Sequence, residues 1–436
     1  MTATVLDRIT LGYRLLWNRH RGLAGIALFM RPDPAPRDGP QLEAAELIES
    51  LRELWSEDSP PLYLVPQAPR LLADLLACTP GTRDPEPEGG GPLFQSGHQL
   101  RPVLVVPESD LGVAGMRQAV RQAHARGVAM VLQGDADAPP DMEVARCFRR
   151  RWLSLPPLLA AQALQAGLRL QSAGIPPGAA PVAGPLPSEQ IYDGIAGRAL
   201  MEYCLDRRHA FALVGWPSED VLHSLRHLPM QPDHRVVQAT LQALEADRAA
   251  EVVERTLMQD AVLTYRFLTY ANSPGLGLRG AVDSVRHGLM MLGVNTLAAW
   301  LAQQLPNAEE DDNLRPVKAQ LTLRARLMDR ILDAGAEEAL RREVLMCGLF
   351  SGLGELLDEP LGALLHRLPL SRRIYEATVL RTGPYAASLA MTIGLEGEDT
   401  AAVRRLREKH EMEAGEVNRA LVRTLAAMEA PARAGG

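Results

Sequence analysis

The first half of the chain alternates short apolar runs with stretches of helical periodicity. Buried strands are predicted at Ala24–Phe29, Leu62–Val65, Val103–Val106 and Val128–Leu132. Between them, apolar residues recur three and four apart in residues 41–55 and 111–124, which is typical of helices that bury one face. Continuously apolar strands that alternate with helices indicate a parallel sheet covered by helices. We therefore expect one α/β unit that is barrel-like, with fewer clear strands than the eight of a complete barrel.

The pattern changes after Trp216-Pro217, and helical periodicity dominates the second half. From Val236 onward no convincing strand pattern occurs. The helix that follows Asp260 is predicted to end at Asn272-Ser273, because Pro274 disfavours the α conformation in the residue before it. The second half is therefore expected to be an all-α domain.

Composition bounds the class of protein but supplies no function. The 436 residues suit two or three domains, and 46 basic against 53 acidic side chains give a net charge of −7, which argues against a general nucleic-acid binder. No apolar run reaches the roughly 18 residues that span a bilayer, and the N-terminus lacks the basic start and apolar core of a signal peptide. The four cysteines lie far apart without CxxC spacing, as expected of reduced thiols in a cytoplasmic protein.

Several motifs of the second half resemble those of HDOD domains. The run Gln259–Leu268, followed by Asn272-Ser273, resembles the core signature of that family. The family's next element resembles Ser284–Gly293, with Trp300 behind it. Because these elements occur in order and at the family's distances, the resemblance implies a helical HDOD domain of the HD-superfamily type.

The first half resembles an EAL domain, the fold of cyclic di-GMP phosphodiesterases. Gly12-Tyr13-Arg14-Leu15-Leu16 lies where such domains begin, and Gly215-Trp216 lies where they end. Together the two halves resemble the two-domain EAL–HDOD signalling proteins of bacteria. The resemblance implies a degenerate EAL-type (β/α) barrel-like domain at residues 1–218 and a helical HDOD domain at 219–428. The last residues, 429–436, are expected to form a flexible tail.

The positions that align with the catalytic residues of EAL domains lack the groups that the reaction needs. By resemblance, that reaction uses carboxylates at strand ends to hold two divalent cations, with a lysine near the attacking water. The aligned positions hold Arg14, Val105 with Glu108 nearby, and Gln133-Gly134. Lysine is absent from the first half, since Lys318 and Lys409 are the two in the chain. We therefore predict no enzyme, no metal and no cofactor, and we retain Arg14 and Glu108 as candidate ligand-contacting residues of the cleft.

The helical half lacks the metal ligands of the HD phosphohydrolase fold, from which the resemblance implies descent. No histidine is followed by aspartate, and no third ligand follows His223 and His227, which stand four apart. We interpret this pair as part of a polar surface. Asp260 and Asn272-Ser273 are candidates for contacting a partner, with a helix cap and a helix end as the alternatives.

Three functions are compatible with these residues. The first is a signal-transduction protein without catalysis that binds other signalling proteins through both domains, since the apolar cores persist where the polar site is lost. The second is a cyclic di-GMP sensor that binds the nucleotide without hydrolysing it, which Arg14 supports. The third is an enzyme of altered chemistry. We favour the first, with protein partners, no nucleic-acid partner and no binding of cyclic di-GMP expected, and with homo-oligomerisation left open.

Overall fold

The chain forms two compact units in the computed structural model, which describes residues 4–34, 42–81, 100–174, 183–278, 280–333 and 337–428. The barrel unit comprises the residues up to Pro217 together with those from Gly394 onward, and the helical unit comprises Ser218–Ile393. The predicted tail at 429–436 lies outside the described residues. The domain limits of 218 and 428 that the sequence suggests stay a prediction.

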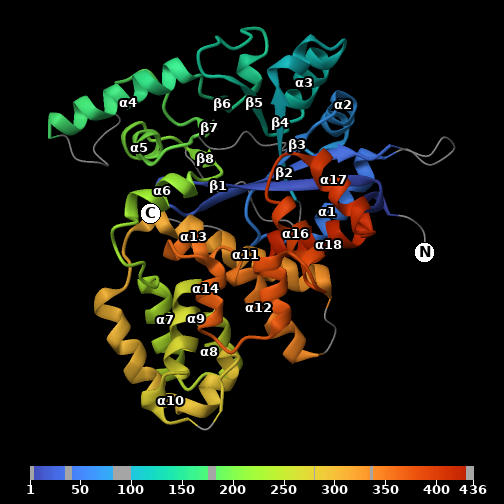
Figure 1. Cartoon of the computed structure of the whole chain (residues 1–436). Helices are drawn as coiled ribbons and strands as arrows, with labels where there is room; N and C mark the ends of the chain where they lie inside the picture. The colour runs from blue at the N-terminus through green and yellow to red at the C-terminus, as the bar shows by residue number, and fades with distance from the viewer. Residues whose placement is uncertain are drawn as a thin grey trace. The chain divides into compact units, whose positions relative to one another are not determined.

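The barrel unit is built on a closed barrel of strands that follow one another in chain order (Figure 1). The described strands are β1 (Ile9–Trp17), β2 (Leu23–Pro32), β3 (Leu62–Pro66), β4 (Val103–Pro107), β5 (Met130–Asp135), β6 (Arg150–Ser154), β7 (Ile191–Asp193) and β8 (Ala212–Val214). Neighbouring strands from β2 to β8 pair in parallel, whereas β1 is antiparallel to both β2 and β8. The parallel strands therefore share one carboxyl end. We call the edge that contains Pro107, Ser154, Asp193 and Val214 the barrel mouth.

The predicted barrel-like α/β fold is confirmed, and the barrel is more complete than expected. Four strands escaped the sequence pattern. Strands β7 and β8 have three residues each, which is too short for a periodic signal, and β6 begins with two arginines. Strand β1 places Thr10, Gly12 and Arg14 between its apolar residues. The expectation of too few strands for a full barrel is therefore corrected.

Helices of the barrel unit flank these strands. They are α1 (Ala44–Leu54), α2 (Pro69–Cys78), α3 (Met116–Ala125), α4 (Pro157–Ser172), α5 (Arg198–Glu202), α17 (Thr400–Lys409) and α18 (Ala414–Ala426). Helix α2 shows how the sequence sets such an element: Pro69 occupies the first turn, where its missing N–H has no helical partner to lose. The buried leucines of α2 then recur at 71, 72, 75 and 76 and form one apolar face.

The barrel interior is a packed apolar core. It is filled by alternate residues of the strands, which include Leu16, Ala27, Phe29, Val65, Val105, Val131, Trp152, Ile191, Ala212 and Val214. The strands are buried on both faces, which explains why β2 to β5 include near-continuous apolar runs. Polar chemistry in this unit is therefore concentrated at the ends of the strands.

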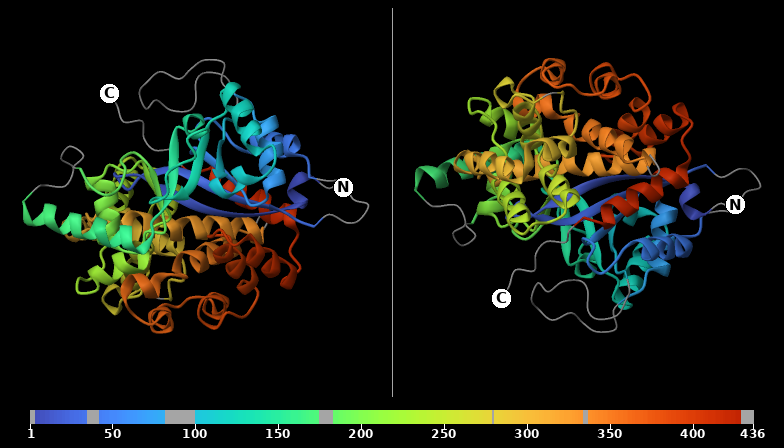
Figure 2. Two further views of the ribbon diagram at one scale, coloured as in Figure 1. Left: turned by 90° about the horizontal axis from the view of Figure 1, so that it is seen from above. Right: turned by 90° about the horizontal axis from the view of Figure 1, so that it is seen from below.

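Strand β1 is longer than its partner on one side, and the end of the chain completes that edge. Strand β8 pairs only with the last two residues of β1, so the rest of the edge needs other hydrogen-bond partners. The Tyr13 N–H donates to Leu395 O at 2.8 Å, and the Asn418 side chain donates to the carbonyls of Leu6 and Ile9. Figure 2 shows α17 and α18, in red, beside the blue β1 in both views. The last helices of the chain thus belong structurally to the barrel unit.

The helical unit contains no strand among its described residues, as the sequence predicts. Its α-helices are α6 (Ser218–Leu225), α7 (His234–Glu245), α8 (Ala250–Leu257), α9 (Ala261–Ala271), α10 (Val285–Gln304), α11 (Arg315–Leu332), α12 (Glu338–Phe350), α13 (Leu353–Leu357), α14 (Leu361–His366), α15 (Arg372–Tyr375) and α16 (Ala386–Gly394), the last residue of which counts with the barrel unit. Helix α9 is buried along most of its length, and α10 is kinked at Gly293, where φ is 73°. Within the described ranges, no helix is long and apolar enough to cross a membrane.

Candidate functional site

Arg14 reaches the barrel mouth from the middle of β1. Its Nη1 donates to Asp193 Oδ1 at 2.7 Å, and its Nη2 donates to Val214 O at 2.9 Å. Nη1 also lies 4.0 Å from Glu398 Oε2. The Arg14 side chain remains 25% exposed, so the guanidinium is anchored but still accessible to solvent. The sequence predicted this residue as a candidate ligand contact, and that role stays a prediction.

Asp193 is the residue of this site that the sequence did not reveal. Its Oδ1 accepts from Arg14 and from the Gly194 N–H at 2.6 Å, while its Oδ2 accepts from Trp152 Nε1 at 3.1 Å. Strand β7, which ends at Asp193, is three residues long and gives no recognisable pattern. An acidic residue directly after the apolar pair Ile191-Tyr192 is the one signal that was available.

Glu108 lies elsewhere on the mouth. It begins a short 3-10 helix directly after β4 and packs over the backbone of β5, where a Cβ at Gly134 would lie 2.5 Å from Glu108 Oε2. Glycine at 134 therefore leaves the space that the carboxylate occupies. Among the described residues, no hydrogen bond or ion pair joins Glu108 to Arg14, so the structure does not unite the two candidates in one contact set.

The residues at the mouth do not fit the pair of divalent cations that the EAL resemblance implies. Val105 belongs to the apolar core, and Gln133 supplies a neutral amide where an anionic oxygen would be needed. In the part of the chain that the structure describes, no group of three or more His, Cys, Asp or Glu side chains could hold a metal ion. His223 and His227 are both exposed, in agreement with a polar surface.

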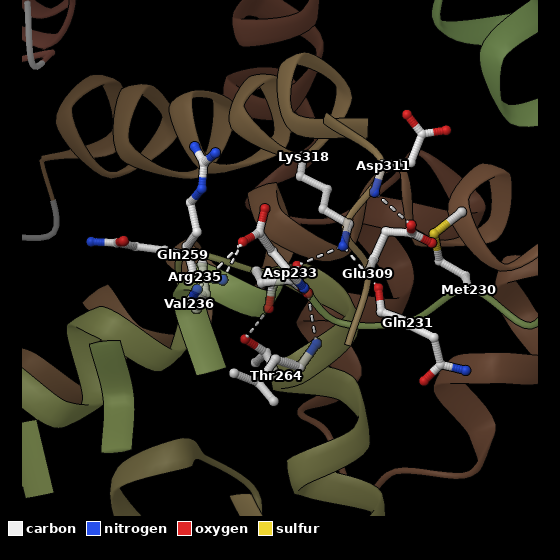
Figure 3. A network of polar contacts seen from close by, with 12 residues as sticks. Met230, Gln231, Asp233, Arg235, Val236, Gln259, Thr264, Glu309, Asp311 and Lys318 are labelled. Atoms are coloured by element: carbon white, nitrogen blue, oxygen red, sulfur yellow. Dashed lines mark hydrogen bonds and ion pairs between the residues drawn. The ribbon is translucent and has the colours of Figure 1, made fainter. Parts of the chain in front are cut away.

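Asp260 lies in the helical unit and is fully buried. One carboxylate oxygen accepts the Leu263 N–H at 2.7 Å and caps α9, as the alternative reading of the sequence predicted. The other oxygen accepts the Asp233 N–H at 2.9 Å and pairs with Lys318 Nζ at 2.9 Å. Lys318 is 4% exposed and also donates to Gln231 O, as Figure 3 shows. Both carboxylate oxygens of Asp260 are thus occupied by contacts within its own unit.

Asn272 is also occupied by internal hydrogen bonds. It ends α9 as the C-cap residue, and its side-chain amide donates to Leu268 O and to Val282 O, each at 2.8 Å. Its Oδ1 accepts the Val282 N–H at 2.9 Å, so the side chain fastens the segment before α10 to the end of α9. Ser273 begins the next turn and is partly exposed. The predicted helix end is confirmed, while contact of either residue with a partner stays a prediction.

Comparison with protein families supports the description of the helical half, and one curated protein matches part of the chain. The model of the HDOD domain family matches residues 228–358. A curated relative, cyclic di-GMP phosphodiesterase CdgJ of Vibrio cholerae, is 26% identical over 163 residues. That match spans 37% of this chain and 37% of the relative, so the chain covers little more than a third of the relative's length.

Solved structures also match parts of the chain. The MmoQ response regulator of Methylococcus capsulatus is 18% identical, with a TM-score of 0.37, over 44% of this chain and 98% of that one. BlrP1 of Klebsiella pneumoniae, in complex with calcium and cyclic di-GMP, is 12% identical, with a TM-score of 0.28, over 50% and 57% of the two chains. The EAL domain of Mycobacterium smegmatis DcpA is 12% identical, with a TM-score of 0.27, over 48% and 90%.

The prediction that this chain is not an enzyme is contradicted by the curated comparison. It was based on lost catalytic groups at aligned positions, whereas the relative that matches the chain is named as a phosphodiesterase. The physical reason for the error is that missing groups at aligned positions do not exclude a reaction supported by other groups.

The family match and the strand topology together identify the two parts of the chain. The helices from α7 to α13 fall within the matched residues, and the strands of the closed barrel lie outside them. The chain carries an HDOD domain at residues 228–358, joined to a closed β/α barrel of the kind that the EAL resemblance predicted.

Proposed function

We propose that this chain is a regulatory protein of bacterial cyclic di-GMP signalling, which binds the nucleotide at the barrel mouth and acts on other signalling proteins through its helical unit. The observation that carries the proposal is the placement of Arg14. Its guanidinium lies at the carboxyl ends of β7 and β8, next to Asp193 and Val214, and keeps a quarter of its side chain exposed. Ligands of β/α barrels bind at this end of the strands.

The surroundings of Arg14 suit the exchange of an internal partner for an anionic ligand. The phosphodiester groups of cyclic di-GMP are anions, and a guanidinium can bind two oxygens of such a group at once. If Arg14 turns to a phosphate, Asp193 keeps the donors Trp152 Nε1 and Gly194 N–H. The carboxylate is then still hydrogen-bonded, so the exchange leaves no orphaned buried charge. The relative named as a cyclic di-GMP phosphodiesterase supports this class of ligand.

The helical unit supports a role in contacting proteins. The polar groups of its family-signature residues Asp260 and Asn272 are engaged in hydrogen bonds within the unit. By contrast, Met290, Met291 and Val294 at the kink of α10 expose 69%, 41% and 55% of their surface. Flexible methionines are common at surfaces that bind protein partners. In capture experiments with extracts of its own cells, we expect the substitution Met290→Glu to abolish binding of the partner proteins that the wild type retains. The substitution should leave nucleotide binding at the barrel unchanged.

The test of the nucleotide site is an isothermal titration of the full-length protein with cyclic di-GMP, with and without Mg²⁺. We expect a one-site isotherm for the wild type and a loss of affinity of about tenfold or more for Arg14→Ala, since a charge-assisted hydrogen bond contributes about 1.5–3 kcal/mol. Chromatography of the same samples measures any linear dinucleotide that hydrolysis forms.

Arg21→Ala is the matched control. Arg21 also forms an ion pair with an aspartate, Asp206, and its side chain is 11% exposed, yet it belongs to the turn between β1 and β2. Its substitution is expected to leave the affinity unchanged. Absence of binding heat in the wild type, or equal losses in the two variants, would contradict the proposal. A linear product would add hydrolysis to the proposed binding.

A further inference from the structure

The helical unit is joined to the barrel unit by two stretches of chain, and both pass Arg14. The first leaves β8 through Gly215–Pro217, and the second returns from α16 through Leu395–Asp399 to α17. All of these residues belong to the barrel unit, and so do the residues of β1 that they contact.

The first stretch, which we call the outgoing connection (215–217), is fastened beside Arg14. The Gly215 N–H donates to Leu15 O at 2.8 Å, and Arg14 Nη2 donates to Val214 O directly before it. Gly215 has φ of 74°, and a Cβ there would lie 2.5 Å from Arg14 Nη2. Glycine is therefore required both by the backbone conformation and by the close approach of the guanidinium.

The second stretch, the returning connection (395–399), lies along the same part of β1. Leu395 O accepts the Tyr13 N–H at 2.8 Å, and Glu398 O accepts from Gln67 Nε2 at 2.6 Å. A Cβ at Gly12 would lie 2.5 Å from the Gly397 carbonyl oxygen, so the connection passes close over the backbone of β1. The Glu398 carboxylate then lies 4.0 Å from Arg14 Nη1.

We infer that Arg14 couples occupancy of the barrel mouth to both connections of the helical unit. This inference rests on the proposed binding of an anionic nucleotide at the mouth. A phosphate that draws the guanidinium away from Val214 O and from the Glu398 carboxylate removes one contact directly before the outgoing connection and one contact of the returning connection at the same time. Asp193 keeps two other donors, so the released state leaves no buried charge without a partner. The signal then passes through the covalent connections of the helical unit.

Two backbone amides report on the two connections. The Gly215 N–H reports on the outgoing connection, because it donates from that connection to Leu15 O of β1. The Tyr13 N–H reports on the returning connection, because it donates from β1 to Leu395 O. Hydrogen–deuterium exchange of the full-length protein, followed by mass spectrometry, measures both. Exchange of the paired strands β4 and β5 serves as the internal standard for global stability.

The first arm needs no nucleotide. Arg14→Gln is expected to speed exchange at both reporter amides by about tenfold more than it speeds exchange of β4 and β5. Glu398→Gln, at a side chain that is 60% exposed, is expected to speed exchange at Tyr13 alone. Arg21→Gln is the control and should affect neither reporter. Faster exchange at one reporter only in Arg14→Gln, or at both in Glu398→Gln, would overturn the inference.

The second arm uses cyclic di-GMP and the wild type. Saturating nucleotide is expected to speed exchange at both reporters, as Arg14→Gln does without it. Nucleotide that binds by calorimetry but leaves both reporters unchanged would overturn the coupling while the proposed function stands. If no nucleotide binds, the proposed function fails, and the variant arm alone decides whether Arg14 fastens both connections.

Discussion

Arg14–Asp193 in the barrel unit and Lys318–Asp260 in the helical unit are both ion pairs that involve a residue of a family motif. Their N···O distances are similar, at 2.7 and 2.9 Å. Their surroundings differ. The side chains of Arg14 and Asp193 are 25% and 12% exposed, whereas those of Lys318 and Asp260 are 4% and 0% exposed. The first pair lies at an open edge of a barrel, and the second is enclosed by helices.

This difference separates a pair that can exchange partners from one that cannot. Asp260 accepts two backbone N–H groups as well as Lys318, and a ligand could reach it only by opening the unit. The charges of such a pair are costly to bury and are balanced by each other. Arg14 keeps accessible surface and a partner that has other donors. Motif residues thus include a structural pair in one unit and a candidate ligand contact in the other.

The largest expected effect follows from breaking the enclosed pair. Lys318→Met leaves the Asp260 carboxylate buried without its cation, which is expected to cost about 3–5 kcal/mol of unfolding free energy. Denaturant unfolding measures the loss. The other lysine of the chain supplies the control, because Lys409 is exposed and Lys409→Met should change stability by less than about 0.5 kcal/mol. Equal small effects would show that the pair is not structural.

A smaller loss is expected at the end of α9. Asn272→Ala removes three hydrogen bonds and leaves the Val282 backbone groups without these partners, which is expected to cost about 2 kcal/mol. Ser273→Ala, next in the chain, should be nearly neutral in the same unfolding measurement. If the Ser273 variant lost as much as the Asn272 variant, the Asn272 side chain would not be the fastening that the structure indicates.

The sequence predicted those parts of the fold that depend on local patterns. Strands β2 to β5 each include an apolar run, and the Asp260 cap stands directly before an apolar helix, so each could be recognised from neighbours in the chain. Contacts between residues far apart in the sequence could not be recognised in this way. Lys318 lies 58 positions from Asp260, and nothing local links the two.

The site itself was predicted only in part. Arg14 was found because a motif surrounds it, whereas Asp193 ends a strand too short to recognise. The return of α17 and α18 to β1 was also missed, because the periodicity of an amphipathic helix gives its apolar face but not the surface that this face covers. The contacts that complete β1 depend on residues near opposite ends of the chain, such as Asn418 and Leu6.

Breaking the open pair is expected to change stability much less than breaking the enclosed one. Arg14→Met leaves Asp193 with Trp152 and Gly194 as donors, so the loss of unfolding free energy should be about 1 kcal/mol. The same variant should lose nucleotide affinity by about tenfold or more. Unfolding and calorimetry on one preparation compare the two effects. A stability loss as large as that of Lys318→Met would make Arg14 a structural residue and remove the contrast between the units.

The finest test follows two buried thiols, one in each unit. Burial raises the pKa of the Cys204 thiol in the barrel unit and of the Cys347 thiol in the helical unit, each to about 12. Because the folded state disfavours the thiolates, each thiol lowers stability as the pH rises above the unfolded pKa of about 8.5 towards the folded value. At pH 8 native labelling is therefore slow, and each cysteine reacts when its own unit opens.

Labelling rates can then separate the two units in one molecule. With Cys78 and Cys147 replaced by alanine, Lys318→Met is expected to speed labelling of Cys347 much more than that of Cys204, since the broken pair lies in the helical unit. Arg14→Met should instead speed labelling of Cys204 more than that of Cys347, and the ratio of the two rates should change by a smaller factor. Peptide mass spectrometry after a thiol-reactive pulse measures both rates. Equal acceleration of the two cysteines in both variants would mean that the units open together, and the contrast between the two ion pairs would then reflect one shared stability rather than two separate local ones.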